Sequence, residues 1–441
     1  MFDFSMRDTI AAPATAPGQA GIGIIRMSGT KAEAILNAVF VPKKASFPLE
    51  DRRLTLGVLS DQGTMIDECM AVIMRAPHSY TREDVVEFQL HGSPRAMKQT
   101  LDALIRQGAR PAEAGEFTLR AFLNGRIDLS QAESVMQLIR ASSDRAARKA
   151  LSQLNGGTSS FVSKIQDRLT SLLAHLEAAI DYPEEVEEEL TEQELADGCR
   201  DIATSLSACV NEQALRLQES GLTVALCGSP NAGKSTLLNA LLQEEKAIVT
   251  PIPGTTRDIV SGDIYLDGCL VHISDTAGLH ESADQVETIG ISRAMEAARQ
   301  ADLVFWLMDG NDPAASPPPP GFPPCTLLYT KGDLAQRMDP PAGSLVISAE
   351  TGEGLNQVRE IILSRIRDIG ETPLASRRHM NLCREAADAL RQAADAFSEG
   401  IPLEFGAVYL HSAMDLLSGI TGTRADEALL SQIFSQFCVG K

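Results

Sequence analysis

Residues 228–235 have the spacing Gly-x-x-x-x-Gly-Lys-Ser, which suits a polyphosphate ligand. The glycines allow successive backbone N–H groups to point inward at phosphate oxygens, and a helix that starts here adds the partial positive charge of its N-terminus. Lys234 can reach the terminal phosphates, and the hydroxyl of Ser235 can bind Mg²⁺. The spacing therefore predicts a cradle for the phosphates of a nucleoside triphosphate.

The alternative reading of this stretch is a glycine-rich turn that binds nothing. Residues 222–227 form an apolar run typical of a buried strand, and residues 236–242 read as a helix. Because the motif requires a strand before it and a helix after it, this context favours the phosphate cradle.

Two further motifs offer oxygen ligands for a metal ion. Asp275-Thr276-Ala277-Gly278 follows the strand candidate 270–274. The Asp275 carboxylate can join the Mg²⁺ shell, and the Gly278 amide can contact a γ-phosphate. Between the cradle and this motif lies Gly254-Thr255-Thr256-Arg257-Asp258, in which a threonine hydroxyl can complete the coordination of Mg²⁺.

The last two motifs concern the base. Residues 330–333, Thr-Lys-Gly-Asp, follow the strand candidate 326–329, and Ser348-Ala349 follows the candidate 345–347. The Asp333 carboxylate can accept hydrogen bonds from the ring N1–H and the exocyclic amino group of guanine, which adenine does not offer. Ser348 and Ala349 can close over the base. Four motifs in this order, each at a strand end or in a loop beside one, predict that the nucleotide is GTP.

The elements that must position these residues alternate along the chain. Strand candidates at 222–227, 270–274, 303–308, 326–329 and 345–347 alternate with helical patterns at 236–242, 290–300 and 354–367. This alternation predicts a doubly wound, mostly parallel sheet with its ligand at the carboxyl ends of the strands. The proline-rich residues 313–324 cannot form the interior of a strand or helix, so we expect an exposed loop there.

The flanking segments differ from this central region in their pattern of apolar residues. Residues 1–125 mix short apolar runs with Gly and Pro turns and one helical pattern at 95–107, which predicts an α+β domain. Apolar residues at helical spacing fill 126–218, including one helix expected over 192–218, and return in 371–441. Each amphipathic helix needs a partner for its apolar stripe, so we expect one discontinuous all-α domain interrupted by the central α/β domain.

Composition sets limits on partners and location. The 441 residues suffice for about three domains of ordinary size. A net charge of −20 disfavours nonspecific nucleic-acid binding over the whole surface, so an RNA partner would need a local basic patch. No apolar run is long enough to span a bilayer, no secretory signal is recognisable, and the eight cysteines form no C-x-x-C pair. We therefore expect a cytoplasmic protein with reduced thiols and no membrane association.

The nucleotide motifs resemble those of Ras-like GTPases, and other features narrow the resemblance. Asn231 in the cradle, the loop 254–258, a G domain inserted in a helical domain and the terminal Cys438-Val439-Gly440-Lys441 together resemble the MnmE (TrmE) family of tRNA modification GTPases. The resemblance spans essentially the whole chain, including residues 83–84 and 121–124. It implies a folate-binding and dimerisation domain over 1–125, a helical domain made of 126–218 and 371–441, and a Ras-like P-loop G domain over 219–370.

The resemblance also implies which residues bind the nucleotide and its ions. The matching GTP-binding positions are Asn231, Ala232, Gly233, Lys234, Ser235, Thr236, Thr250, Pro251, Ile252, Pro253, Gly254, Thr255, Thr256, Asp275, Thr276, Ala277, Gly278, Thr330, Lys331, Asp333, Ser348 and Ala349. Ser235 and Thr256 would hold Mg²⁺. In the resembling family a K⁺ ion supplies the charge that an arginine finger supplies elsewhere, and its ligands match Asn231, Thr250, Ile252 and Thr255.

The expected catalytic residues are Lys234, Asn231 and Glu287. Ras-type enzymes orient the attacking water with a glutamine, but the corresponding position here is Leu279, which cannot hydrogen-bond to water. The family resemblance points instead to Glu287, acting through a bridging water. From the residues alone, Glu287 would read as a surface helix residue.

A folate site in the first domain and at its border is a further implication of the resemblance. Arg26, Glu87, Arg126 and Lys441 match the positions at which the family binds 5-formyl-tetrahydrofolate. Cations can pair with the glutamate carboxylates of the folate, and Glu87 can accept hydrogen bonds from the pterin. A surface ion pair is the alternative for such residues taken singly. Cys438 nearby suggests a thiol with a chemical role, and a buried structural cysteine is the alternative.

In function, the resemblance implies a homodimeric, K⁺-activated GTPase. Its partner would be an MnmG (GidA)-type protein that carries FAD and uses NADH, in a heterotetramer or larger assembly. Together they would add an aminomethyl or carboxymethylaminomethyl group to C5 of the wobble uridine of certain tRNAs. The alternative is a ribosome-assembly or signalling GTPase of the Era or Der kind, for which a basic RNA-binding domain or a second G domain would be expected.

Two positions depart from the family pattern. Thr330 stands where the family has Asn, so we expect one contact to the base and its neighbouring loop to be weakened or remade. Guanine specificity should survive through Asp333, with reduced affinity. Arg126 stands where the family often has Lys, which keeps the charge but changes the hydrogen-bonding geometry.

Overall fold

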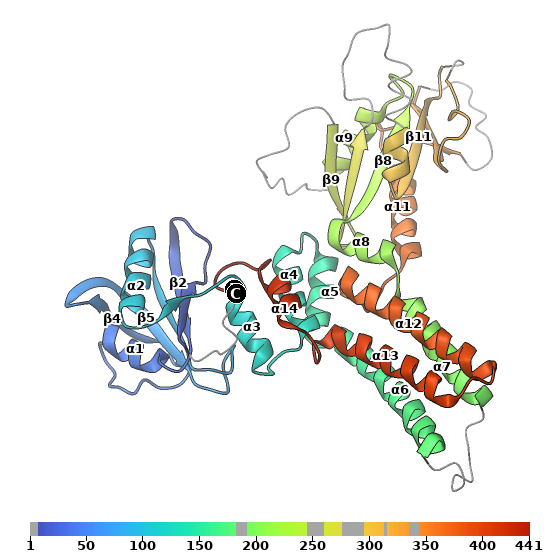
Figure 1. The fold of residues 1–441 in the computed structure, drawn as a ribbon. Helices are drawn as coiled ribbons and strands as arrows, with labels where there is room; N and C mark the ends of the chain where they lie inside the picture. The colour runs from blue at the N-terminus through green and yellow to red at the C-terminus, as the bar shows by residue number, and fades with distance from the viewer. Residues whose placement is uncertain (1–7, 182–191, 245–259, 276–294, 313–314, 335–343) are drawn as a thin grey trace. The chain divides into compact units, whose positions relative to one another are not determined.

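The computed structural model describes residues 8–181, 192–244, 260–275, 295–312, 315–334 and 344–441 (Figure 1). The chain divides into two compact units. The first comprises Met1–Met136, Gln153–Thr204 and Leu382–Lys441, and the second comprises Gln137–Ser152 and Ser205–Asn381. Each unit is therefore discontinuous in sequence.

The first unit begins with a seven-stranded, mostly antiparallel sheet. Its strands lie in the order β3 (Phe40–Pro42), β4 (Thr55–Asp61), β5 (Thr64–Met74), β6 (Val85–Gly92), β2 (Ala20–Ser28), β1 (Ile10–Pro13) and β7 (Arg110–Pro111). Helices α1 (Ala32–Val39) and α2 (Pro94–Arg106) pack on one face, where Ile25, Phe88 and Leu104 are fully buried. This is the α+β arrangement that the sequence predicts.

The pairing of β2 with β6 decides which side chains lie on the other face of this sheet. Arg26 lies opposite Glu87 in the antiparallel register. Side chains alternate along a strand, and Ile25 and Met27 belong to the helix-covered core. Arg26 and its cross-strand neighbour Glu87 are therefore on the face turned away from α1 and α2.

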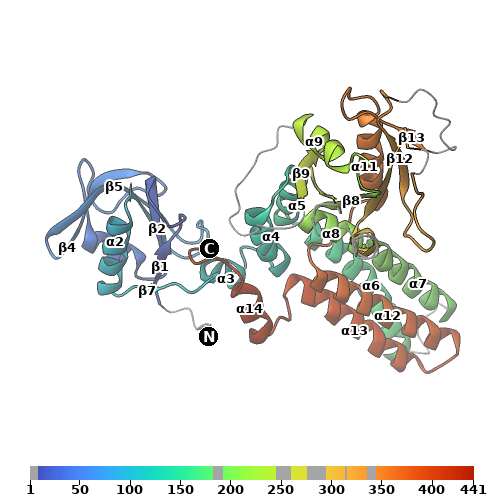
Figure 2. The same cartoon turned by 90° about the horizontal axis from the view of Figure 1, so that it is seen from above.

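The other elements described in the first unit are helices. They include α3 (Glu116–Leu123), α6 (Gly157–Asp181), α13 (Leu403–Thr421) and α14 (Glu427–Phe434). Figures 1 and 2 show α6 and α13 side by side, and Gln166 Nε2 donates to Ser418 Oγ at 3.1 Å. Helices that precede and follow the central region thus pack together, as expected for a discontinuous all-α region.

Four helices contribute residues to both units. They are α4 (Leu129–Arg140), α5 (Asp144–Leu154), α7 (Glu192–Cys209) and α12 (Arg377–Ser398). The single helix expected over 192–218 is in fact two, α7 and α8 (Glu212–Ser220). The break has a local cause, because Asn211 Oδ1 accepts the backbone N–H of Ala214 at 2.9 Å and so caps the start of α8.

The second unit contains a six-stranded sheet. Its order is β13 (Leu345–Val346), β12 (Thr326–Thr330), β11 (Leu303–Asp309), β8 (Leu222–Gly228), β10 (Cys269–Asp275) and β9 (Val260–Leu266). All neighbouring pairs are parallel except β9 with β10. α9 (Lys234–Glu244) and α11 (Leu355–Ile369) cover one face through Leu237 and Ile362. This confirms the expected doubly wound, mostly parallel sheet.

The edge strand β9 is absent from the sequence-based prediction. It pairs with β10 through a tight turn at Asp267 and Gly268, whose φ angles of 49° and 71° both lie in the left-handed region. Such a turn favours Asp-Gly and joins antiparallel strands directly. The dipeptide was therefore the available signal for this hairpin.

The opposite face of the second sheet is covered in part by the proline-rich segment. Trp306 on β11 meets the ring of Phe322 edge-on at 4.8 Å between centroids, and its Nε1–H donates to Ser316 O at 3.1 Å. Residues 315–324 form neither helix nor strand, as expected. They are not simply an exposed loop, because Phe322 is half-buried against the sheet.

Candidate active site

The predicted phosphate cradle connects the central strand β8 to α9. Gly228 has a φ of 137°, and a Cβ at this position would lie 2.2 Å from Leu307 O, so only glycine fits. Asn231 and Gly233 have φ angles of 61° and 84°, which Asn and Gly adopt more readily than other residues. This backbone shape places the N-terminus of α9 at the carboxyl end of β8, where a phosphate is electrostatically favoured.

Lys234 is held within this loop. Its Nζ donates to Gly228 O at 2.9 Å and to Ser229 O at 2.7 Å, and the residue is 4% exposed. Burial lowers the pKa of Lys234, and the nearby Asp275 carboxylate opposes that shift. The ammonium group therefore lies at the cradle, where a phosphate oxygen can compete with the two carbonyls.

Ser235 and Asp275 come together although forty positions separate them in sequence. Ser235 Oγ donates to Asp275 Oδ2 at 2.6 Å. The contact arises because β8 and β10 are parallel neighbours, with Asp275 opposite Leu226, so that both strands end at the same edge of the sheet. A hydroxyl and a carboxylate oxygen are the hard ligands that Mg²⁺ prefers, so the pair fits that ion.

Thr330 joins the guanine motif to the cradle. Its Oγ1 lies 2.8 Å from Ala232 O and 3.2 Å from Met308 O, and the residue is 5% exposed. Because a hydroxyl has a single proton, it donates to one of these carbonyls at a time. The contact to the neighbouring loop is thus remade by a shorter side chain where the family pattern has Asn.

The remaining base-site residues are paired with one another. Lys331 Nζ donates to Asp309 Oδ2 at 2.6 Å, and Ser348 Oγ donates to Asp333 Oδ1 at 2.6 Å. Burial raises the pKa of Asp309, but its bonds to Lys331 and the Asn311 backbone lower that pKa more, so the net shift is downward. The Ser348 bond fixes the Asp333 carboxylate near the ends of β12 and β13, at the edge expected for guanine.

Some predicted site residues lie outside the described part of the chain. They are Thr250, Pro251, Ile252, Pro253, Gly254, Thr255, Thr256, Thr276, Ala277, Gly278 and Glu287. Of the described residues, the exposed Thr236 lies in the first turn of α9 beside Ser235.

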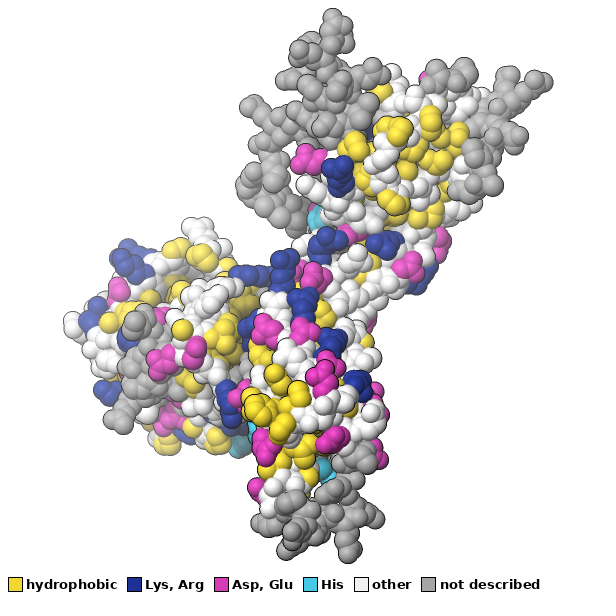
Figure 3. Space-filling view, turned by 45° about the vertical axis from the view of Figure 1, so that its right-hand side comes forward, with side chains coloured by type: hydrophobic (Ala, Val, Ile, Leu, Met, Phe, Trp, Pro, Cys, Tyr) yellow, Lys and Arg dark blue, Asp and Glu magenta, His cyan; other side chains and the backbone are white. Residues whose placement is uncertain are grey.

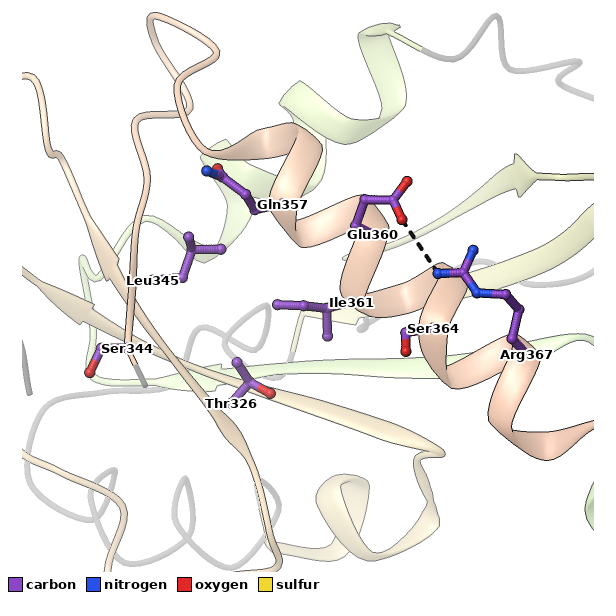
Figure 4. A pocket seen from close by; sticks show the side chains of 8 residues that line it. All are labelled: Thr326, Ser344, Leu345, Gln357, Glu360, Ile361, Ser364 and Arg367. Atoms are coloured by element: carbon purple, nitrogen blue, oxygen red, sulfur yellow. Dashed lines mark hydrogen bonds and ion pairs between the residues drawn. The ribbon is translucent and has the colours of Figure 1, made fainter. Parts of the chain in front are cut away.

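A surface pocket of about 550 Å³ lies elsewhere on the same unit (Figure 4). It is bounded by β12, β13 and α11, and Figure 4 shows Thr326 on one side facing Ile361 and Ser364 on the other. Thr326 begins β12, whereas Thr330 ends it, so this pocket and the nucleotide motifs lie at opposite ends of the strand. Among the predicted site residues that the structure describes, none lines this pocket.

Two of the predicted folate residues, Arg26 and Arg126, contact Tyr80 in the first unit. Arg26 Nε donates to Glu87 Oε1 at 2.7 Å, and the Arg26 guanidinium carbon lies 5.5 Å from the centre of the Tyr80 ring. The Arg126 guanidinium carbon is 4.7 Å from the same ring, and its Nη1 donates to Tyr80 O at 3.1 Å. Two cations on one aromatic ring, beside a carboxylate, form a site that can take an anionic aromatic ligand.

The chain's last residues pack against this part of the unit. Lys441 O accepts the backbone N–H of Phe117 at 3.2 Å, and the Phe117 ring lies 5.8 Å from the Arg26 guanidinium carbon. Gly440 has a φ of 93°, and a Cβ there would lie 2.0 Å from Pro13 O. Cys438 is exposed and therefore does not fit the alternative of a buried structural cysteine.

A buried charge network beside this site was not singled out from the sequence. Arg120 is fully buried and bonds to Glu116 Oε1 at 2.9 Å, Asp8 Oδ1 at 2.6 Å and Glu83 Oε2 at 3.2 Å. Burial alone would raise the pKa of Glu116. Hydrogen bonds from Arg110, the Glu113 backbone and Arg120 lower that pKa by a larger amount, so the net shift is downward. The i, i+4 spacing of Glu116 and Arg120 was the one local signal for this network.

The fold and site define a P-loop GTP-binding protein with a Ras-like domain. A family model described as the MnmE helical domain matches residues 129–438, and one described as the GTP-binding protein TrmE N-terminus matches residues 9–126. A tRNA modification GTPase MnmE of Thermus thermophilus is 39% identical over 99% of this chain and 100% of its own length. That of Symbiobacterium thermophilum is 42% identical over 98% of this chain and 99% of its own length. This chain belongs to the MnmE family of tRNA modification GTPases, and it is a GTP hydrolase.

Among solved structures, the G domain of the T. maritima FeoB iron transporter matches 33% of this chain and 99% of that chain. The identity is 25% and the TM-score is 0.25. Within the described residues, no helix combines the length and the hydropathy that a membrane span requires.

Proposed function

We propose that this chain is a K⁺-activated GTPase that modifies C5 of the wobble uridine of certain tRNAs together with an MnmG-type partner. The group added would be aminomethyl or carboxymethylaminomethyl. The single observation that carries the proposal is full-length membership of a family whose curated relatives are named tRNA modification GTPases. FAD and NADH would belong to the partner, and the two proteins would form a heterotetramer or larger assembly.

The described residues support an assignment of roles in GTP hydrolysis. Lys234 and the N-terminus of α9 would bind the phosphates, while Ser235, Asp275 and Thr256 would provide the Mg²⁺ shell. When bound, Mg²⁺ offsets the charge that develops on the phosphate oxygens. Thr330 and Ser348 would hold the cradle and Asp333 in the spacing that a guanine nucleotide requires.

Potassium activation is assigned to the loop around Asn231. This side chain is exposed, and its φ of 61° lets an amide project from the cradle without the strain that most residues would incur. Thr250, Ile252 and Thr255 would complete the K⁺ site, and Glu287 would orient the attacking water through a second water. Those four residues enter the proposal through the family resemblance alone.

We call Tyr80 and the neighbouring Arg26, Glu87 and Arg126 the Tyr80 cluster. This cluster is the proposed site for 5-formyl-tetrahydrofolate. Arg26, Arg126 and Lys441 would bind its carboxylates, and Glu87 would accept from the pterin. Exposed Cys438 offers a direct test, because a bound folate should slow alkylation of that thiol by iodoacetamide. Burial raises the pKa of Cys69 and of Cys199 to about 12, so these two thiols should stay unreactive and serve as internal controls. An unchanged rate at Cys438 in saturating folate would contradict this site.

The proposed homodimer would form through the seven-stranded sheet. Its face turned away from α1 and α2 includes Ile22, Val41 and Leu56, which are 59%, 61% and 43% exposed. A second copy would cover these apolar side chains. Sedimentation of the wild-type protein and of an Ile22→Asp/Leu56→Asp variant would distinguish a dimer that uses this face from a monomer.

The domain boundaries and location complete the proposal. We assign residues 1–125 to the folate-binding domain, 126–218 and 371–441 to the helical domain and 219–370 to the inserted G domain, in a cytoplasmic protein. The boundaries imply that residues 219–370 alone should bind GTP.

The deciding experiment is mass spectrometry of tRNA hydrolysates from a strain that lacks this gene. The proposal expects an unmodified wobble uridine, restored by the wild-type gene but not by Lys234→Ala. Lys164→Ala, at an exposed position on α6, is the matched control and should restore modification. Unchanged tRNA together with defective ribosomal subunits would instead favour a GTPase of the Era or Der kind.

A further inference from the structure

The second unit carries a basic surface that the nucleotide site does not use. Residues 137–152 and 370–378 together contain six cations and two carboxylates, although the whole chain has a net charge of −20. The cations are Arg140, Arg145, Arg148, Lys149, Arg377 and Arg378. Figure 3 shows Lys and Arg side chains in dark blue with Asp and Glu side chains in magenta among them. We call these two segments the basic surface.

The two segments are brought together by direct contacts. Arg145 Nη2 donates to Gly370 O at 3.3 Å and lies 3.5 Å from Glu371 Oε1, and Gln137 Nε2 donates to Ala375 O. Both segments belong to the same compact unit. The two segments that carry these cations are therefore neighbours within one unit.

Not all of these cations are available to a partner. Arg145 is committed to structure, because its backbone N–H also donates to Gly268 O at 2.9 Å and its guanidinium lies 3.6 Å from Cys269 Sγ. Arg140 and Arg378 also make interactions within the chain, whereas Arg148 and Arg377 are exposed. The nearby acidic groups are Asp144, Asp267, Glu219 and Glu371, so cations remain in excess.

The geometry points to this basic surface as the place where the phosphate backbone of tRNA docks. This inference rests on the proposed tRNA substrate and adds to it a location on the chain. The exposed cations Arg148 and Arg377 are arginines, whose planar forks pair with phosphate oxygens through two hydrogen bonds. An acidic chain cannot attract RNA over its whole surface, so binding must be concentrated where cations exceed carboxylates.

The position of the surface also relates it to the GTP site. Arg145 and Arg148 lie against the turn that begins β10, since a Cβ at Gly268 would be 3.1 Å from Arg148 Nη2. The same strand ends at Asp275, which bonds to Ser235. RNA bound at the surface would therefore contact arginines that pack against the turn leading into the strand that ends at Asp275.

The test is binding of a fluorescein-labelled tRNA transcript to the full-length protein in a KCl titration. Arg148→Glu/Arg377→Glu should weaken binding at least about tenfold and reduce the slope of log K against log[KCl] by about 2, since two phosphate contacts are lost. Lys164→Glu/Arg168→Glu is the matched control. It makes the same change in net charge at two exposed positions on α6 and should change affinity less than about twofold.

Arg148→Gln/Arg377→Gln removes charge without reversing it and should give a smaller loss in the same direction. Intrinsic GTP hydrolysis without tRNA should match wild type in all three variants and shows that they are folded. Equal losses in the charge-reversal variant and the α6 control, or no loss in either, would overturn the inference. So would a poly-glutamate peptide that displaces the transcript at equal charge concentration, because the surface would then fit an acidic protein.

The outcome is separable from that of the proposed function. If tRNA hydrolysates from the deletion strain are fully modified, the proposed function fails whatever the binding data show. If modification is lost in that strain and Arg148→Glu/Arg377→Glu binds the transcript like wild type, only the docking surface fails.

Discussion

The hydroxyl oxygen of Thr330 lies 2.8 Å from the carbonyl oxygen of Ala232, so a single side chain connects the guanine motif to the phosphate cradle. The carbonyl belongs to a buried residue, and Thr330 itself is 5% exposed. A nucleotide that binds at both motifs depends on their spacing. We therefore propose that Thr330 is a positioning residue for GTP rather than a ligand of the base.

Replacing Thr330 with valine should weaken nucleotide binding. Valine keeps the shape but leaves the buried carbonyl without this donor, a loss of about 1–3 kcal/mol, which corresponds to about 5- to 150-fold in Kd. Thr330→Ser retains the hydroxyl and should stay within about threefold of wild type. The Kd of each variant is measured by titration with a fluorescent GDP analogue at a temperature well below the melting temperature. Wild-type affinity in the valine variant would exclude a positioning role.

Changing Asp275 to asparagine should make GTP hydrolysis need more Mg²⁺. The substitution removes the carboxylate charge at the hydroxyl of Ser235, and loss of such a supporting ligand typically costs about 10–100-fold in metal affinity or activity. The measurement is the Mg²⁺ concentration for half-maximal turnover at saturating GTP. Asp263→Asn makes the same chemical change at an exposed position on β9 and should leave the requirement unaltered. An unshifted Mg²⁺ curve for Asp275→Asn would remove this residue from the metal site.

The Arg120 network should make the first unit sensitive to acid. The pKa values of Asp8 and Glu116 are lowered in the folded chain. Their contribution to stability is therefore complete above the ordinary pKa of about 4–4.5 and is lost as the pH falls through the lowered values. Glu116→Gln should lower stability at pH 7 by about 3 kcal/mol, because it uncouples a buried arginine, and should flatten the decline below pH 5.

Urea unfolding followed by far-UV circular dichroism measures that change, with an internal control. The protein's single tryptophan, Trp306, lies in the second unit, so its fluorescence transition should not move in Glu116→Gln. Glu50→Gln, at an ion pair whose side chains are 68% and 70% exposed, should change stability by less than about 1 kcal/mol. If the stability of Glu116→Gln declined at low pH as steeply as that of wild type, another titrating group would be the main cause of the acid sensitivity.

The success of the sequence-based prediction follows burial. β8 and β11 contribute buried residues to the cores on both faces of the sheet, so they appear as continuous apolar runs, and the motif at the end of β8 is placed once its run is found. β9 is an edge strand with alternating burial, so it has no continuous apolar run. Its prediction from sequence would have to rely on the Asp-Gly turn that follows it. The break between α7 and α8 depends on one capping residue, Asn211. A single cap does not interrupt the helical spacing of apolar residues, so the sequence pattern predicts one helix.

The Tyr80 cluster could not be located from spacing. Arg26 and Arg126 are a hundred positions apart and share a tyrosine only because β2, the loop before β6 and the end of α3 converge in the folded unit. No periodic pattern encodes that convergence. Family resemblance supplied both arginines and Glu87, whereas Tyr80, which both guanidinium groups contact, carries no motif and emerges from the structure alone.

The sharpest remaining prediction concerns Asn231 and K⁺. If its side-chain oxygen is a K⁺ ligand, wild-type turnover should be much faster in K⁺ than in Na⁺ at equal ionic strength, and Asn231→Ala should lose that difference while largely retaining nucleotide binding. Alanine at a φ of 61° also strains the loop by about 1 kcal/mol, which could lower activity without any cation effect.

Asn231→Gly separates the two causes, since glycine accepts this backbone conformation and lacks the amide. Loss of the K⁺ to Na⁺ ratio in both variants identifies the side chain as the ligand. Recovery of the ratio in the glycine variant would mean that Asn231 serves only to shape the cradle, and equal wild-type rates in the two salts would exclude K⁺ activation altogether.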